Sequence, residues 1–406
     1  MLYDIGFAIF SIFYLPALIF KGKLHGDFAE RFGNFTPDKL KSLENARGAI
    51  WIQAVSVGEV AVCKGLVSKL KAELPDKKIV ISTITKTGND LAKRLFSQDT
   101  TVIYFPLDFS FIVKKVVALI KPVIYIMIET EIWPNLLKEM ADNKVPSILI
   151  NGRISDRSYD KYVLASPLLK KTLGRIGRFC MQSALDAERI VFIGAPKDRV
   201  EITGNMKFDV EINADLKAME TLKESLSLKA DEELLVAGST HSGEEEIVLK
   251  SFKELLKDFP KLKLLIAPRH IERASDVRIL ADKVGVTPVF VLDKIGYLNS
   301  AYSFATLVFI GGSLVKHGGQ NPIEPAIFEK AILFGPHMFN FKDISASFLK
   351  NNAAISVSNN KELTESIRML LTDKAKRDEL GRSAKRTVSE GRGATDRNIK
   401  VIKEYA

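Results

Sequence analysis

Two successive series of short apolar segments, separated by stretches with helical periodicity, constrain the fold of this chain more than any other feature. Near-continuous apolar strands that alternate with helices are typical of a parallel sheet covered on both faces. The first series comprises 49–54, 78–82, 102–105, 123–128 and 147–151, with two further candidates at 178–182 and 201–203. The second series comprises 234–238, 262–267, 289–292, 307–310, 331–334 and 353–357. Since 406 residues are also too many for one ordinary core, we predict two α/β domains.

A polar, helix-prone stretch without an apolar strand separates the two series. We therefore predict an N-terminal Rossmann-like domain over 25–210, an interdomain linker over 211–230 and a C-terminal Rossmann-like domain over 231–406. Two last helices, about 375–386 and from Asp396 onward, are expected to close the C-terminal domain. Two doubly wound sheets imply an interdomain cleft, with ligand-binding groups at the carboxyl ends of the strands.

The first 24 residues are predicted to form a membrane anchor, because Ile5–Phe20 is an apolar run without a charge that is closed by Lys21 and Lys23. The run is slightly shorter than the roughly 20 residues that cross a bilayer core, and Pro16 interrupts it. No small-residue cleavage site follows, which favours a retained anchor over a removed signal peptide. A short span, a helix in the membrane interface and a buried core helix all stay open. The cations after the run place the downstream domains in the cytoplasm.

The net charge of +10 suits an anionic partner such as an acidic membrane face or a phosphorylated substrate. Nucleic acid is the least supported partner, because no arginine-rich or aromatic-interleaved tract occurs. A basic surface without a specific partner is an equally good explanation of the charge. The two cysteines, Cys63 and Cys180, stand alone in apolar surroundings, so neither a disulfide framework nor a zinc site is predicted.

Carboxylates follow two strands of the first series at the point where each strand is predicted to end. Glu59 opens a helix after a turn of small residues, where it either stabilises the helix N-terminus or removes a proton from an attacking hydroxyl. The helix dipole is expected to keep it ionised, as a base requires. Glu129 and Glu131 face one side of an extended segment. A metal site is disfavoured here, because no Asp-x-Asp occurs in the sequence and no histidine is near.

The end of the first series and the second series supply cations and a glycine-rich loop. Lys207 lies at the domain crossing, where it is either a solvated lysine or a cation for a substrate carboxylate or a departing phosphate. Arg269 follows a strand and offers a guanidinium. The segment 311–325 reads as a strand end, a glycine-rich loop and a helix start near Pro322, where backbone N–H groups can hold a phosphate. Glu324 could accept hydrogen bonds from a ribose diol.

The histidines show no metal-ligand spacing, and we predict no metal site. Four of them fall in predicted turns of the second domain, and among these His317 is expected to touch a ligand. The five are His25, His241, His270, His317 and His337.

These stretches together resemble the 3-deoxy-D-manno-octulosonic acid (Kdo) transferases that modify lipid A. The matching motifs occur in the family's order: WIQAVSVGE, TITKTG, ETEIWPN, NGRIS, GNMKFD, AGSTHSGEEE, APRH, FIGGSLVKHGGQNPIEP and FGPHMFNFKDI. They extend from Trp51 to Ile344 and so cover most of the chain. The resemblance implies a glycosyltransferase-B (GT-B) architecture with an N-terminal acceptor domain and a C-terminal donor domain. It also implies inverting transfer of Kdo from CMP-Kdo to a lipid A precursor, lipid IVA, in lipopolysaccharide biosynthesis.

The resemblance further implies roles for individual residues. Glu59 is the base, while Glu129 and Lys207 support the transition state. A side-chain contact at Tyr297 is in doubt, because the family often has an acidic residue there; a backbone contact would survive. The CMP-binding residues would be Pro268, Arg269, Ile295, Gly296, Tyr297, Asn321, Pro322, Ile323 and Glu324.

No cofactor is implied, and a monophosphate leaving group needs less help from a divalent metal than a diphosphate does. The implied location is the inner membrane, with the catalytic domains on its cytoplasmic side. Two other functions stay open at this point. One is a different GT-B nucleotide-sugar transferase or epimerase, which donor tests with UDP-sugars would reveal. The other is a non-catalytic lipid-binding relative, which the presence of Glu59 argues against.

Overall fold

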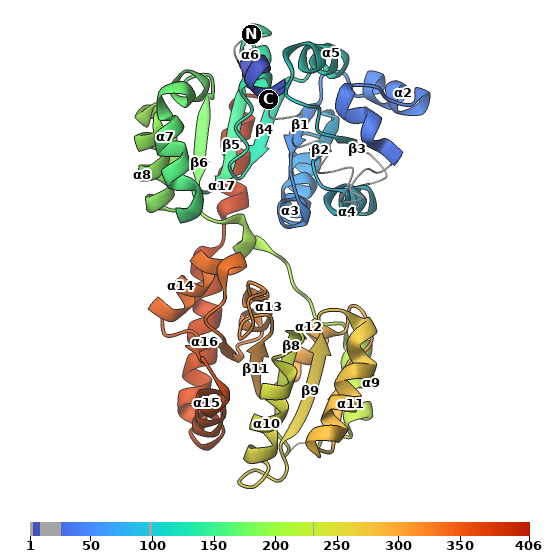
Figure 1. The fold of residues 1–406 in the computed structure, drawn as a ribbon, viewed down its shortest axis with the longest axis vertical. Coiled ribbons are helices and arrows are strands. Elements are labelled where there is room, and N and C mark those ends of the chain that lie inside the picture. Colours follow the sequence, from blue (N-terminus) through green and yellow to red (C-terminus); the bar gives the residue numbers. More distant parts are fainter. Residues whose placement is uncertain (1–2, 9–25, 97–99, 230) are drawn as a thin grey trace. The chain divides into compact units, whose positions relative to one another are not determined.

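The computed structural model describes residues 3–8, 26–96, 100–229 and 231–406. They form two compact units, each with its own parallel sheet (Figure 1). The first unit comprises Met1–Val210 together with Arg392–Ala406, and the second comprises Glu211–Gly391. Each predicted strand segment contains or overlaps a strand of the structure, which confirms the expected α/β class with two doubly wound sheets.

The first unit is built on a seven-stranded sheet in the order β3-β2-β1-β4-β5-β6-β7, in which all neighbours pair in parallel. Its strands are β1 (Ile50–Gln53), β2 (Ile79–Thr83), β3 (Thr100–Tyr104), β4 (Ile124–Ile128), β5 (Ser147–Gly152), β6 (Arg178–Met181) and β7 (Val200–Ile202). Its helical segments are η1 (Gly26–Phe32), α2 (Pro37–Asn45), α3 (Val57–Glu73), α4 (Lys86–Phe96), α5 (Ser110–Ile120), α6 (Pro134–Asp142), α7 (Asp156–Leu173), α8 (Ala184–Ile193), η2 (Lys197–Arg199), η3 (Met206–Asp209) and α17 (Ala394–Lys403).

Both faces of this sheet are buried, which explains why its strands lack the alternation of polar and apolar residues. In β1, Trp51 packs into the core on one face, while Ile50 and Ile52 pack into the core on the other. The indole Nε1 of Trp51 donates to Ser82 Oγ over 2.8 Å, so the buried polar group of this side chain is satisfied.

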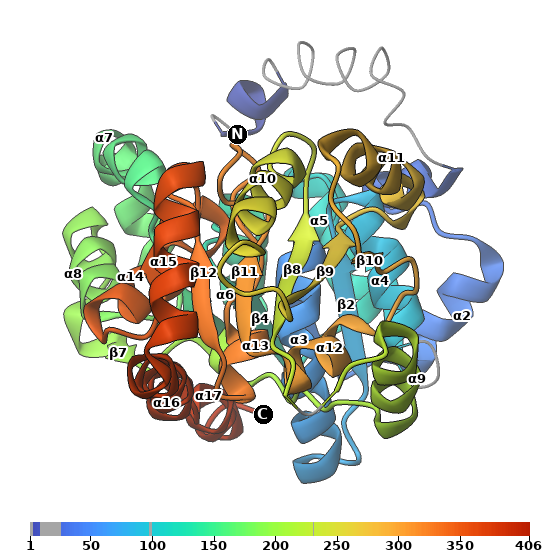
Figure 2. The ribbon, with the colours of Figure 1, turned by 90° about the horizontal axis from the view of Figure 1, so that it is seen from below.

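The second unit holds a six-stranded parallel sheet in the order β10-β9-β8-β11-β12-β13 (Figure 2). Its strands are β8 (Leu234–Thr240), β9 (Lys263–Pro268), β10 (Val289–Val291), β11 (Leu307–Ile310), β12 (Ala331–Phe334) and β13 (Ile355–Ser356). Its helical segments are α9 (Leu216–Leu226), α10 (Glu245–Leu255), η4 (Ile271–Arg273), α11 (Ala274–Val284), α12 (Leu298–Phe304), α13 (Ile323–Ile327), η5 (Phe339–Phe341), α14 (Lys342–Lys350), α15 (Asn360–Thr372) and α16 (Lys374–Gly391).

Each sheet has one point at which the strand order reverses direction. In the first unit it lies between β1 and β4, and in the second between β8 and β11. Ligands of open parallel sheets bind outside the carboxyl ends of the strands at such switch points. A ligand-binding site is therefore expected at the residues that follow these four strands.

The division of the chain differs from the predicted one at two places. The expected linker contains α9, which packs against α12. The backbone N–H of its N-cap Asp215 donates to Ser300 Oγ over 3.0 Å. The last helix, α17, belongs to the first unit and not to the C-terminal domain. Asp209 binds the start of α17 by accepting from the N–H groups of Gly393 and Thr395. Apolar contacts that α17 makes with the first sheet could not be read from the amphipathic pattern of the helix alone.

Residues 1–2 and 9–24 of the predicted N-terminal anchor lie outside the described residues. Of the part that is described, Asp4 accepts hydrogen bonds from the N–H of Ser110 over 2.8 Å and from Asn135 Nδ2 over 3.0 Å. Within the described residues, no helix combines the length and the apolar character needed to span a membrane.

Candidate active site

Glu59 lies at the switch point of the first unit, in the first turn of α3 directly after β1. Its side chain bends back over the helix start. Oε2 accepts from the Val55 N–H over 2.6 Å, and Oε1 accepts from Ser56 Oγ over 3.2 Å. This arrangement is a variant of the capping box, with Ser56 at the N-cap and a glutamate three residues later. The residue is only 9% exposed.

The ionisation expected for Glu59 from the sequence was wrong. Burial raises its pKa to about 8, and the nearby charge of Glu129 raises it further than the Val55 hydrogen bond can compensate. The helix dipole was the right interaction to consider, but desolvation outweighs it. A carboxyl group with a pKa close to the working pH is well matched to general acid–base catalysis.

Two further catalytic candidates meet beside Glu59. The Lys207 Nζ lies 3.5 Å from Glu129 Oε1, and both side chains keep about a fifth to a quarter of their surface exposed, 21% and 24%. Glu129 follows β4 in a left-handed conformation, with φ of 61°. Glu131 lies close enough to Glu129 to feel its charge: burial and that charge raise the pKa of Glu131 to about 7. Trp133 Nε1 donates to Glu131 over 2.9 Å, which opposes the shift. The structure therefore brings the three predicted catalytic residues of the first unit together.

Asn151, at the end of β5, was missed as a functional candidate. It is fully buried with φ of 52°, and its Oδ1 accepts from the Met206 N–H over 3.0 Å. Gln182 Nε2 donates to its carbonyl over 2.9 Å. Since Met206 directly precedes Lys207, Asn151 fixes the short helical turn that carries the cation. The sequence signal was the polar NGR motif after an apolar strand.

In the second unit, the predicted CMP-binding residues lie after β9 and β11. Arg269 follows β9, where its N–H donates to Thr240 O over 2.9 Å and its side chain is exposed. Asn321 supports the start of α13: its Oδ1 accepts from the Ile323 N–H over 3.1 Å and its Nδ2 donates to Glu324 Oε1 over 3.3 Å. Burial raises the pKa of Glu324, and the charge of Arg269 opposes that shift. Pro322 and Ile323 are buried and serve packing.

The segment Ile295–Tyr297 lies between β10 and α12. Ile295 is 82% exposed, Gly296 has φ of 89°, and the Lys294 ammonium lies 5.4 Å from the ring centroid of Tyr297. Its strand, β10, pairs with β9, so the segment follows the strand next to the one that precedes Arg269. The role of this segment in binding stays a prediction.

The amides of the glycine-rich loop after β11 have a partner that was not expected. The buried carboxylate of Glu244 accepts from the N–H groups of His241, Gly312 and Leu314. Burial raises the pKa of Glu244 to about 7 despite these hydrogen bonds. The loop amides that could receive a phosphate are thus partly occupied by an anion of the protein itself. The sequence signal was the run of three glutamates after Gly243.

Three of the histidines gather at the same place. The rings of His241 and His317 are stacked, with centroids 4.2 Å apart and planes at 10°, and His270 meets His241 edge-on at 6.0 Å. Burial and the neighbouring positive groups lower the pKa of His241 to about 4. Within the residues that the structure covers, no group of three or more His, Cys, Asp or Glu is arranged to hold a metal ion.

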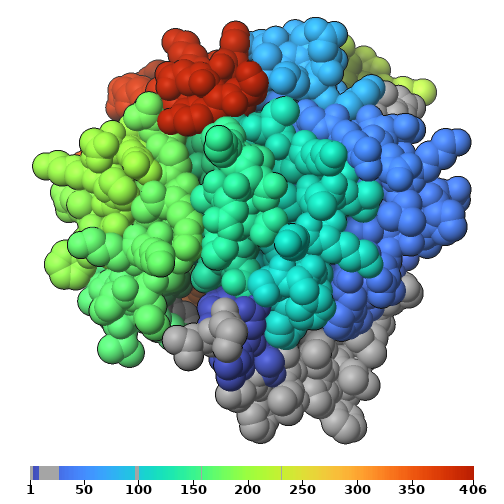
Figure 3. Space-filling model, turned by 90° about the horizontal axis from the view of Figure 1, so that it is seen from above, coloured from blue at the N-terminus to red at the C-terminus, as the bar shows by residue number. Residues whose placement is uncertain are grey.

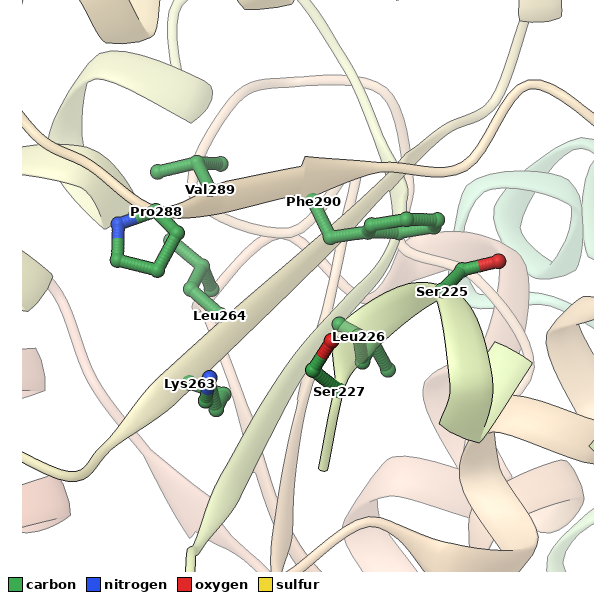
Figure 4. A pocket seen from close by; sticks show the side chains of 8 residues that line it. All are labelled: Ser225, Leu226, Ser227, Lys263, Leu264, Pro288, Val289 and Phe290. Carbon is green, nitrogen blue, oxygen red and sulfur yellow. The ribbon is translucent and has the colours of Figure 1, made fainter. Parts of the chain in front are cut away.

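A pocket of about 250 Å³ lies elsewhere in the second unit (Figure 4). It is lined by Ser225, Leu226, Ser227, Lys263, Leu264, Pro288, Val289 and Phe290. Lys263 and Val289 begin their strands, so the pocket lies toward the amino ends of β9 and β10. It is separate from the carboxyl ends, where the candidate site residues lie.

Two parallel-sheet units with polar residues after the strands that flank the switch points define a two-domain α/β protein of the GT-B type. The solved structures agree with this fold. A glycosyltransferase from Rickettsia africae ESF-5 is similar with a TM-score of 0.62 at 12% identity, over 88% of this chain and 98% of that one. The UDP-GlcNAc 2-epimerase from Neisseria meningitidis has a TM-score of 0.62 at 12% identity, over 88% of this chain and 100% of that one.

Sequence similarity identifies the family to which this chain belongs. The model for 3-deoxy-D-manno-octulosonic-acid transferases (kdotransferases) matches residues 26–210. The 3-deoxy-D-manno-octulosonic acid transferase of Haemophilus influenzae is 34% identical over 372 residues, which covers 88% of this chain and 87% of the relative. The chain belongs to the 3-deoxy-D-manno-octulosonic acid transferase family, and it is an enzyme of the glycosyltransferase class.

Proposed function

We propose that this enzyme transfers Kdo from CMP-Kdo to a hydroxyl of a phosphorylated lipid A precursor, with Glu59 as the base. The observation that carries the proposal is the position of Glu59 at the switch point of the first unit, beside the Glu129–Lys207 pair, with a pKa of about 8. Family membership supports the choice of Kdo as the transferred sugar.

The proposed reaction is a single displacement. The acceptor oxygen forms a bond to the anomeric carbon of Kdo as the bond from that carbon to the phosphate oxygen breaks. CMP leaves with the bonding electrons, and the hydroxyl proton passes to the Glu59 carboxylate. Lys207, held by Glu129, stabilises the negative charge of the sugar carboxylate or the leaving phosphate. One displacement inverts the anomeric centre.

In this proposal the second unit binds the cytidine monophosphate part of the donor. Arg269 is exposed and close enough to Glu324 for its charge to lower the pKa of that carboxyl. A guanidinium suits an anionic donor, while Glu324 suits a ribose diol. We assign the donor contacts to these two residues and Asn321, with the Ile295–Tyr297 segment closing the other side.

We further propose that the first unit works at the cytoplasmic face of the inner membrane. The net charge of +10 favours an anionic surface. Leu164 and Leu168 of α7 are 86% and 82% exposed, and the exposed Lys161 and Lys171 flank them on the same helix face. Figure 3 shows the first unit from the side on which the green segment with α7 and α8 lies beside the teal segment with α5 and α6. Leucines between lysines suit the boundary between acyl chains and anionic headgroups.

One assay tests the donor and the acceptor together. The full chain is incubated with CMP-Kdo and tetraacyl lipid A precursor in the presence of EDTA, and products are counted by mass. We expect Kdo to be added to the lipid without divalent metal. Transfer from UDP-N-acetylglucosamine instead, or the absence of any Kdo-modified lipid in an otherwise folded preparation, would refute the proposal.

A further inference from the structure

The glycine-rich loop of the second unit carries an internal anion. Glu244 Oε1 accepts from the His241 N–H over 2.7 Å and from the Gly312 N–H, and Oε2 accepts from the Leu314 N–H over 3.4 Å. Glu244 is 0% exposed, so a ligand cannot replace it without opening the turn. Another loop amide, that of Gly319, donates to Gly312 O over 2.8 Å. These backbone N–H groups therefore already donate to oxygen atoms of the protein itself.

Imidazole and guanidinium side chains lie at the same edge of the sheet, and among them His241 Nε2 lies 3.4 Å from Gln320 Nε2. His241 follows β8 and His317 lies in the loop after β11, the two strands that flank the switch point. Their rings stack at 4.2 Å, and His317 is exposed to solvent. Arg269 and His270 follow the adjacent β9, and both charges act on His241. A neutral imidazole has one ring N–H donor and a protonated imidazole has two, so either form can donate to an oxyanion.

We propose that the stacked pair His241–His317, with Arg269 beside it, binds the phosphate of the nucleotide donor, and that Glu244 is the positioning residue of the pair. The inference rests on the proposed donor and deepens it, because it names the groups that contact the anion. Glu244 ties the backbone of His241 to Gly312 and Leu314, so its carboxylate sets the distance between the turn after β8 and the loop that carries His317.

The charges around His241 agree with this assignment. The pKa of His241 is lowered by burial first and then by His317, His270, Arg269 and Arg273. Crowded positive groups of this kind repel one another until an anion arrives, and an anion bound among them favours their protonated forms. A phosphate among these side chains therefore gains charge-assisted hydrogen bonds from groups other than the amides that donate to Glu244.

The test compares CMP with cytidine, which lacks the phosphate, as ligands of the full chain in calorimetric titrations. His241→Ala and His317→Ala are each expected to weaken CMP binding about 10- to 100-fold, the loss typical of a hydrogen bond to a charged group. Cytidine affinity is expected to stay unchanged. His337→Ala, in the same unit but outside the stack, is the matched control and is expected to bind both ligands normally. Glu244→Gln is expected to reproduce part of the CMP defect.

Because His317 is exposed, its alanine variant is expected to fold, and a thermal melt verifies this. Equal losses for CMP and cytidine would show a general structural role and overturn the inference, as would unchanged CMP affinity in both histidine variants. In those cases the proposed donor survives, because the wild-type chain still binds CMP. A wild-type chain that binds neither compound would overturn the proposed donor and this inference with it.

Discussion

Glu59→Gln keeps the size of the side chain and removes the group that can take a proton. General base catalysis contributes about 100- to 10,000-fold, so the variant is expected to lose at least about 100-fold in kcat/KM for the donor. The wild-type profile has a predictable shape as well. With a pKa of about 8 for Glu59, kcat/KM is expected to rise about tenfold for each pH unit below that value and to level off above it.

The assay measures Kdo transfer by mass between pH 6 and pH 9, at saturating acceptor and limiting donor. Saturation with acceptor keeps any change of acceptor affinity with pH out of the profile. Glu73→Gln is the control, because Glu73 lies at the other end of α3 and makes a partly exposed 2.8 Å ion pair with Lys403. It is expected to keep the wild-type rate and profile. A flat wild-type profile over this range, or a Glu59→Gln variant with normal turnover, would refute the role of Glu59.

The same ionisation has a consequence for stability. The pKa of Glu59 is higher in the folded protein than in the unfolded chain, where it takes its ordinary value of 4.5. The folded state therefore binds the proton more tightly, and the protein loses stability as pH rises from about 4.5 through about 8. Relative to wild type, Glu59→Gln is expected to gain more thermal stability at pH 9 than at pH 5. An equal effect at both values would show that burial does not hold the carboxyl group protonated.

Four further substitutions probe the rest of the site and the fold. Lys207→Met is expected to lower kcat about 100-fold or more through loss of charge stabilisation, and to shift the pH profile to higher pH because Glu129 is then unpaired beside Glu59. Asn151→Ala leaves the buried N–H before Lys207 without its acceptor, and denaturant titration is expected to show a loss of about 1–3 kcal/mol together with a reduced kcat. The double change of Leu164 and Leu168 to glutamate is expected to reduce co-sedimentation with anionic lipid vesicles several-fold. Because both leucines are exposed, the unfolding free energy of this variant is expected to stay within about 0.5 kcal/mol of wild type. Asp209→Ala removes the acceptor of two N–H groups at the start of α17, and a loss of about 1–3 kcal/mol in the unfolding of the first unit would confirm that the last helix belongs there.

The central strands, such as β1, β4 and β11, could be predicted from the sequence because they are buried on both faces and therefore mostly apolar. The same pattern could not assign α17, since an amphipathic helix shows which face is buried but not which sheet covers it. Glu59, Glu129 and Lys207 were recognisable from motifs and strand ends. The protonation of Glu59 was not, because it depends on burial and on the distance to Glu129, neither of which a motif states.

The role of Glu244 was hidden for a related reason. A run of glutamates at a helix start reads as a solvated, dipole-stabilised turn. Which of them turns inward depends on backbone N–H groups supplied by Gly312 and Leu314, about seventy residues further along the chain. Hydrogen bonds between such distant segments have no local sequence signature.

Backbone strain offers a way to separate site residues from structural ones at the strand ends. Outside glycine, a left-handed φ costs of order 1 kcal/mol or more, and it persists only where the surroundings impose it. Lys121 and Ser227 adopt it as helix C-caps, where it ends a helix. Glu129 adopts it directly after β4. Asn151 adopts it directly before the last residue of β5, and Ser239 adopts it directly before the last residue of β8. All three positions lie at or beside the switch points. No helix is ended by these three, so their strain has no capping role. Two of them instead contact the segment that carries Lys207: Glu129 pairs with Lys207 itself, and Asn151 accepts from the Met206 N–H before it.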